Sequence, residues 1–527
     1  MPLGDEKHKL IYEELVNILG EDYVEDDVAV MEAFSRDALS PSYTTKGRAE
    51  FIVLPGSTED VQQIIKLANR YRFPYSISST GLQLFTCCAV EGYPYWCFID
   101  PKRMNHLYLD GNNMYAVVEP YVTVAQVQAE AMKRGLFTGV TGASSQGSAL
   151  ATHLLTNMQW TSWRTGTGRN ILGIEWVLPN GEILRTGSLA VPGAGYCWGE
   201  GPGIDVRGML KGTTGHMGAL GVITRAAIKL HPWPGPSVWP TEGVQPEKKS
   251  TLPPETFKTY ILNYPTLEKC VESIRELAEA EIGGVVIQFA PWDFVCWASR
   301  SREEFWARWQ TEYWQRQTKK GHMVWVTLWG FTSEKQVEYE EKVLLQIIED
   351  TGGELIPDEE AEWLSSCLTP NSVRDTHRPR FLRLGTTGAI YLMADSLFDT
   401  LRSIPVASEI KAKYTPPIGD GSLFDMGFNQ HKFWPADFGR LAWVEIDCFG
   451  EKSDEWETLL RKGIRRDVIT QAIENSVLDT GCFYDASLTG PTFANIHLLL
   501  AGIKKALDPN NLASPTRLIN IDKIEQG

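Results

Sequence analysis

The chain has 527 residues, 43% hydrophobic and 22% charged, which is the composition of a globular protein with two or three packed domains. Its formal net charge of −16 argues against nucleic acid or an anionic membrane surface as a partner. The sequence has no apolar run long enough to cross a bilayer and no apolar segment behind a basic N-terminus, so we expect a soluble, cytoplasmic protein.

The first predicted unit is a strand, a turn and a helix that begin within residues 51–61. Ser57 is the expected N-cap, and Asp60 stands at the third helical position, as in a capping box. A short strand at 75–77 then opens into the polar loop 78–83. Apolar residues follow the cap at helical spacing: Val61, Ile64, Ile65, Leu67 and Ala68. This order predicts an α/β unit that ends in a polar loop.

A second unit runs from a strand at 115–120 through a helix at 123–134 to the small-residue loop 141–148. Loops with small residues and many backbone donors suit a pyrophosphate, although each loop taken alone is also an ordinary solvated turn. Neither loop belongs to a P-loop or to a sound Gly-x-Gly-x-x-Gly motif after a strand, so a nicotinamide Rossmann site is not supported.

The third notable stretch, residues 208–230, holds five glycines spaced three or four apart and then a β-branched strand at 222–230. Glycine in a helix interior costs up to about 1 kcal/mol relative to alanine, so a stable helix is not expected here. Either the glycines form a surface loop, or their backbone approaches another body more closely than a Cβ atom allows. The strand that follows at once favours the close approach.

A proline-rich segment at 231–254 predicts a domain boundary. Beyond it, residues 256–413 carry eight tryptophans on predicted helices and strands. One stripe at helical spacing consists of Phe305, Trp306, Trp309 and Tyr313, and a packed core or interface explains it better than a ligand cage.

Cysteine and histidine are scattered along the chain. The nine cysteines never form the two-residue-spaced pairs that zinc and iron–sulfur sites favour, and the nine histidines form no ligand pair. We therefore expect mostly reduced, buried thiols and no protein-bound metal.

Five segments taken in order resemble one family, the vanillyl-alcohol oxidase and p-cresol methylhydroxylase superfamily of flavoproteins. Within it, the third stretch below, together with Gly-Pro-Gly-Ile-Asp at 201–205, is most similar to the phenol-oxidising branch. The segments are VLPGSTEDV at 53–61, AVVEP at 116–120, WVLPNGEILRTG at 176–187, the glycine stretch at 208–230 and LDPNNL at 507–512.

The resemblance implies an α+β protein that binds FAD. It implies a PCMH-type FAD-binding domain of two α/β subdomains at 1–240, an α+β cap or substrate domain at 241–480, and a C-terminal return to the FAD domain at 481–527. In the family the glycine stretch lies against FAD, which would explain its missing side chains. The residues that would bind FAD are Ser78, Ser79, Thr80, Gly81, Leu82, Gln83, Gly142, Ala143, Ser144, Gln146, Gly147, Ser148, Gly218, Gly221, Val222, Ile223 and Arg517.

The chain departs from the family in both loops. The first loop keeps only Gly81, and Tyr121 stands where the family has a glycine. Neither loop offers a histidine or cysteine that could tether FAD, so we expect the cofactor to be released by acid or heat. A covalent link, if one exists, would come from the cap, for instance from His431.

Candidate catalytic residues follow from the same resemblance. The phenol oxidases use a Tyr-Arg pair near the C-terminus, and here Tyr484 is followed by an aspartate. Arg380 and Arg383 could hold a carboxylate or stabilise an anionic reduced flavin. His431 and His377 are possible bases.

Three functional hypotheses remain open. The first is an FAD-dependent oxidase or dehydrogenase that oxidises a small aromatic alcohol or phenol by hydride transfer to flavin N5. The second is a D-2-hydroxy acid dehydrogenase of the glycolate or lactate type that passes electrons to an acceptor protein, although the segment 417–424 lacks the histidines of that branch's metal motif. The third is a non-catalytic subunit that has lost FAD. We expect a homodimer in each case.

Overall fold

The structure is a computed structural model of the chain. It describes residues 4–524 except for a set of internal gaps. The gaps are 35–47, 81–92, 94, 140–144, 155–169, 213–214, 245–246, 375–385, 416–430, 437–438, 451–462, 465–466, 468–469, 471–473, 476–477, 480–489 and 522–523.

The N-terminal sheet has four strands in the order β1-β2-β4-β3, and β2, β4 and β3 run parallel. Helices α1 and α3 pack on it and on each other. The bounds are α1 Asp5–Leu19, η1 Glu21–Tyr23, β1 Val24–Glu25, α2 Val28–Phe34, β2 Phe51–Val53, α3 Thr58–Tyr71, β3 Tyr75–Ile77 and β4 Cys97–Ile99.

Helix α3 forms for the reasons that its sequence predicts. Ser57 Oγ accepts a hydrogen bond from the Asp60 N–H at 3.0 Å, and the Asp60 carboxylate reaches back to the Gly56 N–H. All five predicted apolar residues are buried. The predicted cap, the helix and the strand β3 after it are confirmed.

The second sheet has five strands in the order β5-β6-β10-β8-β9, and every pairing is antiparallel. A register shift between Ile223 and Arg225 marks a β-bulge at Thr224 on β10. The bounds are β5 Leu107–Asp110, β6 Tyr115–Val118, α4 Val124–Met132, β7 Leu136–Phe137, α5 Ala149–Leu154, β8 Ile171–Val177, β9 Ile183–Arg185, η4 Gly187–Ala190, η5 Val206–Met209, β10 Val222–Lys229 and β11 His231–Pro232.

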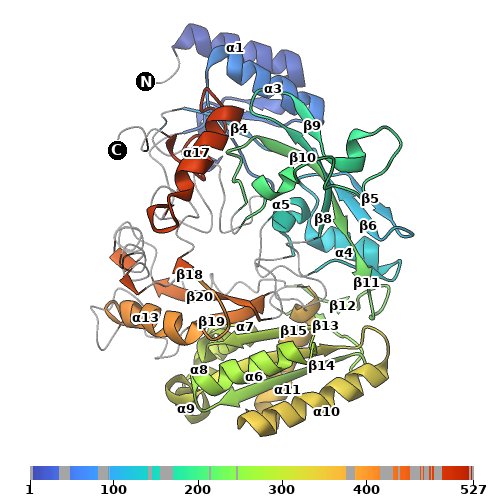
Figure 1. Ribbon diagram of the computed structural model, residues 1–527, viewed down its shortest axis with the longest axis vertical. Coiled ribbons are helices and arrows are strands. Elements are labelled where there is room, and N and C mark those ends of the chain that lie inside the picture. Colours follow the sequence, from blue (N-terminus) through green and yellow to red (C-terminus); the bar gives the residue numbers. More distant parts are fainter. Residues whose placement is uncertain are drawn as a thin grey trace.

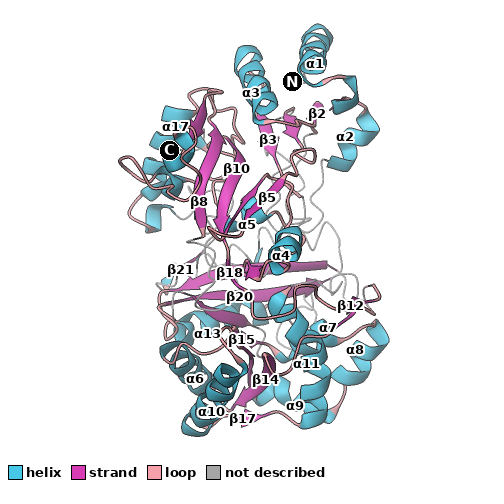
Figure 2. Ribbon diagram, turned by 90° about the vertical axis from the view of Figure 1, so that its right-hand side faces the viewer, coloured by secondary structure: helices cyan, strands magenta, loops and turns pink. Residues whose placement is uncertain are grey.

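The cap is built on an eight-stranded sheet in the order β17-β14-β16-β15-β19-β20-β18-β21, again with antiparallel pairings. Strands β18 and β20 lie on the side of the cap nearest the other two sheets (Figures 1 and 2). Its strands are β14 Phe257–Tyr264, β15 Val285–Phe289, β16 His322–Trp329, β17 Glu354–Leu355, β18 Thr386–Ala394, β19 Lys432–Ala436, β20 Leu441–Gly450 and β21 Leu478–Asp479. Strands β12 Thr241–Glu242 and β13 Lys249–Ser250 pair separately as a two-stranded sheet.

Helices cover both faces of the cap sheet. One face packs on α6, α10 and α13, and the other on α7, α8, α9 and α11. The bounds are α6 Leu267–Glu279, α7 Pro291–Ala298, α8 Arg302–Trp309, α9 Glu312–Lys320, α10 Glu334–Thr351, α11 Asp358–Val373 and α13 Thr400–Ala412.

The tryptophans of the cap form its core. Alternate residues of β16 point to opposite faces, so Trp325 and Trp329 enter one cluster while Val324 and Val326 enter the other. In the predicted helical stripe Phe305 and Trp309 are buried, whereas Trp306 is 37% exposed. Tyr313, on the next helix α9, is partly buried and packs against the same core cluster, so the core interpretation holds for three of the four members.

The C-terminal segment packs on the first two sheets rather than on the cap (Figures 1 and 2). Helix α17, Ile496–Leu507, follows η8, Gly490–Thr492, and buries Ile503 and Leu507 against the core of the five-stranded sheet. Ala513 then bridges to Tyr75 at the edge of the four-stranded sheet. The domain boundaries at 240 and 480 stay predictions.

The described helices and sheets are the mixed architecture that the sequence predicts, so the fold class is confirmed. Among the described residues, no helix combines the length and the apolar character that a membrane span requires. Of the cysteines in the described part of the chain, Cys97, Cys270, Cys296 and Cys367 are buried without a disulfide bond, and Cys197 is exposed.

Candidate functional site

The first part of the site is the end of β3. The chain leaves the strand at Ile77 and continues through Ser78, Ser79 and Thr80. The hydroxyls of Tyr75 and Thr80 are buried and have no hydrogen-bond partner within the described part of the chain. Gly81, Leu82 and Gln83, which complete the predicted loop, lie outside the described residues.

The second part is the glycine turn, residues 215–221. Its backbone has positive φ at Gly215, Met217, Gly218 and Gly221, a conformation that residues other than glycine rarely adopt. A Cβ on Gly218 would lie 2.8 Å from Ser514 Oγ and 3.1 Å from Ile77 Cγ2. The turn therefore lies directly against the end of β3 and against the C-terminal segment.

Gly221 is needed for a different reason from the one expected. A Cβ there would lie 2.3 Å from the carbonyl oxygen of Val177 and 2.9 Å from Trp176 Nε1. The predicted close approach is real, but the body approached is the neighbouring strand β8. The protein's own packing thus requires this glycine, whatever else the turn contacts.

The third part is the C-terminal loop, residues 511–518. The Ser514 N–H donates to the Tyr75 carbonyl at 2.8 Å, which holds the loop against β3. Positive φ values at Asn511, Ser514 and Leu518 mark a backbone that its own sequence does not favour. The side-chain oxygens of Ser514 and Thr516 and the side-chain amide of Asn511 are buried, and no described residue forms a hydrogen bond with them.

We call these three segments together, residues 75–80, 215–221 and 511–518, the cradle. Sequence reasoning found the first two parts from their small and polar residues. It missed Ser514 and Thr516, although the motif LDPNNL directly before them was recognised. The signal that could have found them is the hydroxyl-rich run Ser-Pro-Thr-Arg at 514–517.

The second small-residue loop is held at the start of α4. The N–H of Val124 donates to Gly147, the N–H of Ala125 donates to Ser145, and Ser148 bridges to Thr123. Ser145 Oγ is buried and has no hydrogen-bond partner among the residues that the structure describes. Of the other predicted residues, Gln146 is exposed, while Gly142, Ala143 and Ser144 lie outside the described part of the chain.

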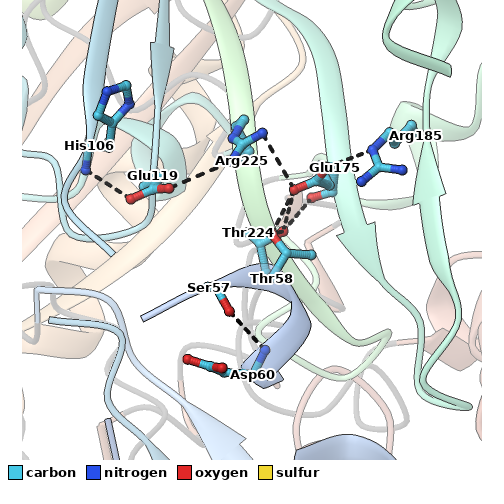
Figure 3. A network of polar contacts seen from close by, with 9 residues as sticks. All are labelled: Ser57, Thr58, Asp60, His106, Glu119, Glu175, Arg185, Thr224 and Arg225. Carbon is cyan, nitrogen blue, oxygen red and sulfur yellow. Dashed lines mark hydrogen bonds and ion pairs between the residues drawn. The ribbon is translucent and has the colours of Figure 1, made fainter. Parts of the chain in front are cut away.

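A buried carboxylate fastens helix α3 to the five-stranded sheet (Figure 3). Glu175 on β8 accepts hydrogen bonds from Thr58 Oγ1 at 2.6 Å and from Arg185 Nε at 2.7 Å. At the bulge, the Thr224 hydroxyl lies within hydrogen-bonding distance of Thr58 and Glu175. Arg225 lies 3.9 Å from the Glu175 carboxylate. Despite burial, the pKa of Glu175 is lowered, because Thr58 and the two arginines stabilise the anion.

The remaining predicted cofactor residues are buried beside these segments. Val222 and Ile223 begin β10, next to the glycine turn, and Arg517 follows Ser514 and Thr516 in the C-terminal loop. Their predicted contacts with a cofactor remain proposals.

The structure describes one of the predicted catalytic residues. Tyr484, Arg380, Arg383 and His377 lie outside the described residues. His431 precedes β19, is buried, and neither of its ring nitrogens has a hydrogen-bond partner.

His431 lies on the same face of the cap sheet as Phe433, with His322 at a ring-centroid distance of 6.1 Å. Burial, followed by His322 and Lys411, lowers the pKa of His431 to about 3. A neutral imidazole can accept a proton. The face that carries His431, however, packs on α6, α10 and α13, and it is the core of the opposite face that includes Met132, Phe137 and Met217.

No group of three or more histidine, cysteine, aspartate and glutamate side chains within the described ranges could hold a metal ion.

Comparison with known proteins finds a family match within the first half of the chain. Residues 49–187 match the FAD binding domain family. A glycolate oxidase subunit of Bacillus subtilis is 26% identical over 286 residues, which cover 53% of each protein. The flavoprotein subunit of 4-cresol dehydrogenase from Pseudomonas putida is 30% identical over 186 residues, 34% of each protein. The chain thus matches about half or less of the length of these relatives.

The fold extends the likeness to the whole chain. The crystal structure of p-cresol methylhydroxylase with substrate bound superimposes with a TM-score of 0.76 and 18% identity, and covers 99% of this chain and 98% of that one. At this identity the match shows the fold, which includes the cap.

The cradle fits FAD. A dinucleotide carries pyrophosphate and ribose oxygens that hydrogen-bond with hydroxyls and backbone N–H groups. The hydroxyls of Thr80, Ser514 and Thr516 in the cradle, which have no partner among the described residues, supply groups of that kind, and Ser145 in the second loop adds another. The predicted resemblance is confirmed to this extent: residues 49–187 match an FAD binding domain with FAD as its cofactor, and the chain has the fold of p-cresol methylhydroxylase.

Proposed function

We propose that the protein is an FAD-dependent oxidoreductase that oxidises a small aromatic alcohol or phenol. The observation that carries the proposal is the match to p-cresol methylhydroxylase over nearly the whole chain, cap included. A substrate site in this fold is formed between the cofactor domain and the cap, so a cap of the same architecture supports a substrate of the same class.

FAD, when bound, supplies the hydride acceptor, flavin N5. The chain must hold the substrate with its reacting C–H bond toward that acceptor, exclude water and stabilise the charge that develops. We assign the contact with the substrate hydroxyl to Tyr484. Arg380 and Arg383 are the candidates for stabilising negative charge, since a guanidinium keeps its charge at all physiological pH values.

Contacts between helix α4 and the end of the cap helix α11 support a substrate site of fixed geometry. Gln128 on α4 donates to the Val373 carbonyl at 3.0 Å and accepts from Arg374 Nε at 3.0 Å. Arg374 also lies 4.8 Å from the centre of the Trp239 ring. These contacts hold α11 of the cap against α4, directly before the segment that carries Arg380 and Arg383.

The tryptophans of the cap do not contribute to this proposal. Trp292, Trp297, Trp325 and Trp329 are at most 3% exposed and pack in one core cluster. The preference for aromatic substrates therefore depends on Tyr484 and on the fold.

A second candidate is a D-2-hydroxy acid dehydrogenase that passes electrons to a partner protein. The observation in its favour is the 26% identity with a glycolate oxidase subunit. In that case Arg380 and Arg383 would bind the substrate carboxylate.

The test is a screen of flavin reduction without oxygen. We expect 4-alkylphenols and aromatic alcohols to reduce the flavin faster than D-lactate or glycolate. Tyr484→Phe should slow reduction roughly tenfold to a thousandfold, the range expected when one positioned polar group is lost. Rapid reduction by D-lactate, unaffected by Tyr484→Phe, would instead support the second candidate, and a protein that cannot be loaded with FAD would be a non-catalytic subunit.

Tyr339→Phe is the matched control for this experiment. Tyr339 lies on α10 and is 64% exposed, so removing its hydroxyl should leave both the flavin and its reduction unchanged.

A further inference from the structure

Among the described lysines that form ion pairs, Lys504 has the most deeply buried side chain, which is 0% exposed. Its ammonium group makes three hydrogen bonds: to the Asp508 carboxylate at 2.7 Å, to the Ala513 carbonyl at 2.7 Å and to the Ala219 carbonyl at 2.9 Å. An ammonium group has three donors, so all of them are used.

Asp508 is buried to the same degree and is also fully engaged. Its carboxylate accepts from Lys504 and from the N–H groups of Leu512 and Ala513. A buried ion pair of this kind adds little stability relative to an apolar pair, because both charges must leave water. A large contribution to stability is therefore a weak explanation for Lys504, and its geometry suggests another.

The three partners of Lys504 belong to different segments. Ala219 is in the glycine turn, Ala513 is in the C-terminal loop, and Asp508 follows α17. The carbonyls of Ala219 and Ala513 converge on one ammonium group, although they are nearly three hundred residues apart in the chain. Without the cation, two buried carbonyl oxygens would face each other with no donor between them.

The two segments that Lys504 joins form two sides of the cradle. The residue after Ala513 is Ser514, and the residue before Ala219 is Gly218. A Cβ on Gly218 would lie 2.8 Å from Ser514 Oγ, so the segments touch at the point next to the lysine. The buried hydroxyls of Ser514 and Thr516 depend on this loop position.

We infer that Lys504 is a positioning residue for FAD: it fixes the glycine turn and the C-terminal loop in the arrangement that binds the cofactor before the cofactor arrives. Lys504 itself is enclosed by protein and need not touch FAD. The inference rests on FAD binding by the cradle and not on the reaction that the holoenzyme performs.

The test compares two variants by FAD affinity and by the melting temperature of the apoprotein. Lys504→Met removes the cation but leaves the Asp508 charge buried and unpaired, so it should lower both. In Lys504→Met with Asp508→Asn the unpaired charge is also gone, while one side-chain acceptor for the Leu512 and Ala513 N–H groups remains. We expect this double variant to regain most of the melting temperature and to keep an FAD dissociation constant raised about tenfold or more, the size expected for lost charge-assisted hydrogen bonds.

An affinity of the double variant within twofold of the wild type would overturn the inference. Lys505→Met is the control, because Lys505 is the exposed neighbour on the same helix and its replacement should change neither quantity. If the wild-type protein itself bound no FAD, the cofactor assignment would fail, which is a separate outcome.

Hydrogen exchange on the wild-type apoprotein tests the same inference without any variant. The N–H groups of Leu512 and Ala513 donate to Asp508, and that of Ala219 donates to the His216 carbonyl. These three amides should be protected before FAD is added. Free exchange in the apoprotein, with protection only after FAD is added, would contradict the inference.

Discussion

Two buried lysine–carboxylate pairs show how differently the FAD-binding half and the cap are built. In the cap, Lys432 and Glu445 stand directly opposite each other on the neighbouring strands β19 and β20, with 2.7 Å between the charged atoms. In the FAD-binding half, Lys504 joins segments that share no strand pairing. The first pair lies within a sheet whose ladder already fixes the geometry, and the second fixes geometry that no ladder provides.

The backbone shows the same contrast. The cap ladder between β18 and β20 pairs nine residues in unbroken register. The cradle, by comparison, contains positive φ angles at Met217, Asn511, Ser514 and Leu518. Both halves bury polar atoms that have no hydrogen-bond partner among the described residues, including the ring nitrogens of His431 in the cap, so the contrast lies in the backbone. Strand pairing fixes the backbone of the cap, whereas the cradle holds a conformation that its own residues do not favour.

The largest effect that would sharpen this contrast concerns the two glycines of the turn. Gly221→Val places a side chain against the Val177 carbonyl at a φ of +104°, so it should cost about 4 kcal/mol or more of folding free energy. Gly218→Val also places a β-branched residue at positive φ, at +76°, but the nearest atom is the end of the Ser514 side chain rather than a backbone carbonyl. It should therefore cost less folding free energy than Gly221→Val and should also weaken FAD binding. Denaturant unfolding and FAD titration of both variants check this, and equal loss of stability in the two would remove the distinction.

The cap should respond in the opposite way. Trp325 is fully buried, and its indole N–H donates to Thr327 Oγ1 at 2.7 Å. Trp325→Ala should cost about 3 kcal/mol or more, because it leaves a large cavity in the core. The FAD dissociation constant of the folded fraction should not change. Loss of FAD from a folded Trp325→Ala protein would show that the two halves are not separable.

Acid should weaken both halves. Burial lowers the pKa of His153, His216 and His322 to about 4 and that of His431 to about 3. Since the unfolded chain binds these protons below about pH 6.5 and the folded chain does not until about pH 4, stability should fall as the pH decreases through this window.

The measurement is the free energy of unfolding in urea at pH 7, 6, 5 and 4.5. Because neither ring nitrogen of His431 has a partner, His431→Leu should flatten the pH dependence with little loss of stability at pH 7. An unchanged slope in this variant would mean that His431 is hydrated or protonated in the folded protein.

The smallest expected effect is at the link between the two sheets of the FAD-binding half. Glu175→Gln keeps the hydrogen bond with Thr58 but loses the ionic contact with Arg185 and Arg225, so it should cost about 1–2 kcal/mol. Arg185→Gln should cost less than 1 kcal/mol, because the arginine side chain is 43% exposed. Thermal melts of the apoproteins rank the two, and a larger loss for Arg185→Gln would contradict the role given to Glu175.

The sequence by itself determined the local elements of the FAD-binding half. Ser57 and Asp60 define the start of α3, and Thr123 with Gln126 forms a capping box at the start of α4, because these side chains bond to backbone groups within the same turn. The apolar spacing of Val61 to Ala68 determined which face of α3 is buried. The ordered motifs were sufficient to predict the FAD binding domain and its cofactor.

Only the tertiary structure decided which distant groups meet. The bond from Lys504 to Ala219, the contact of Gly218 with Ser514 and the reason for Gly221 all join segments far apart in the chain. The face on which His431 lies was decided in the same way, because it follows from strand pairing in the cap sheet. Local sequence patterns carry information about neighbours within a few residues, whereas these contacts depend on how three sheets pack together.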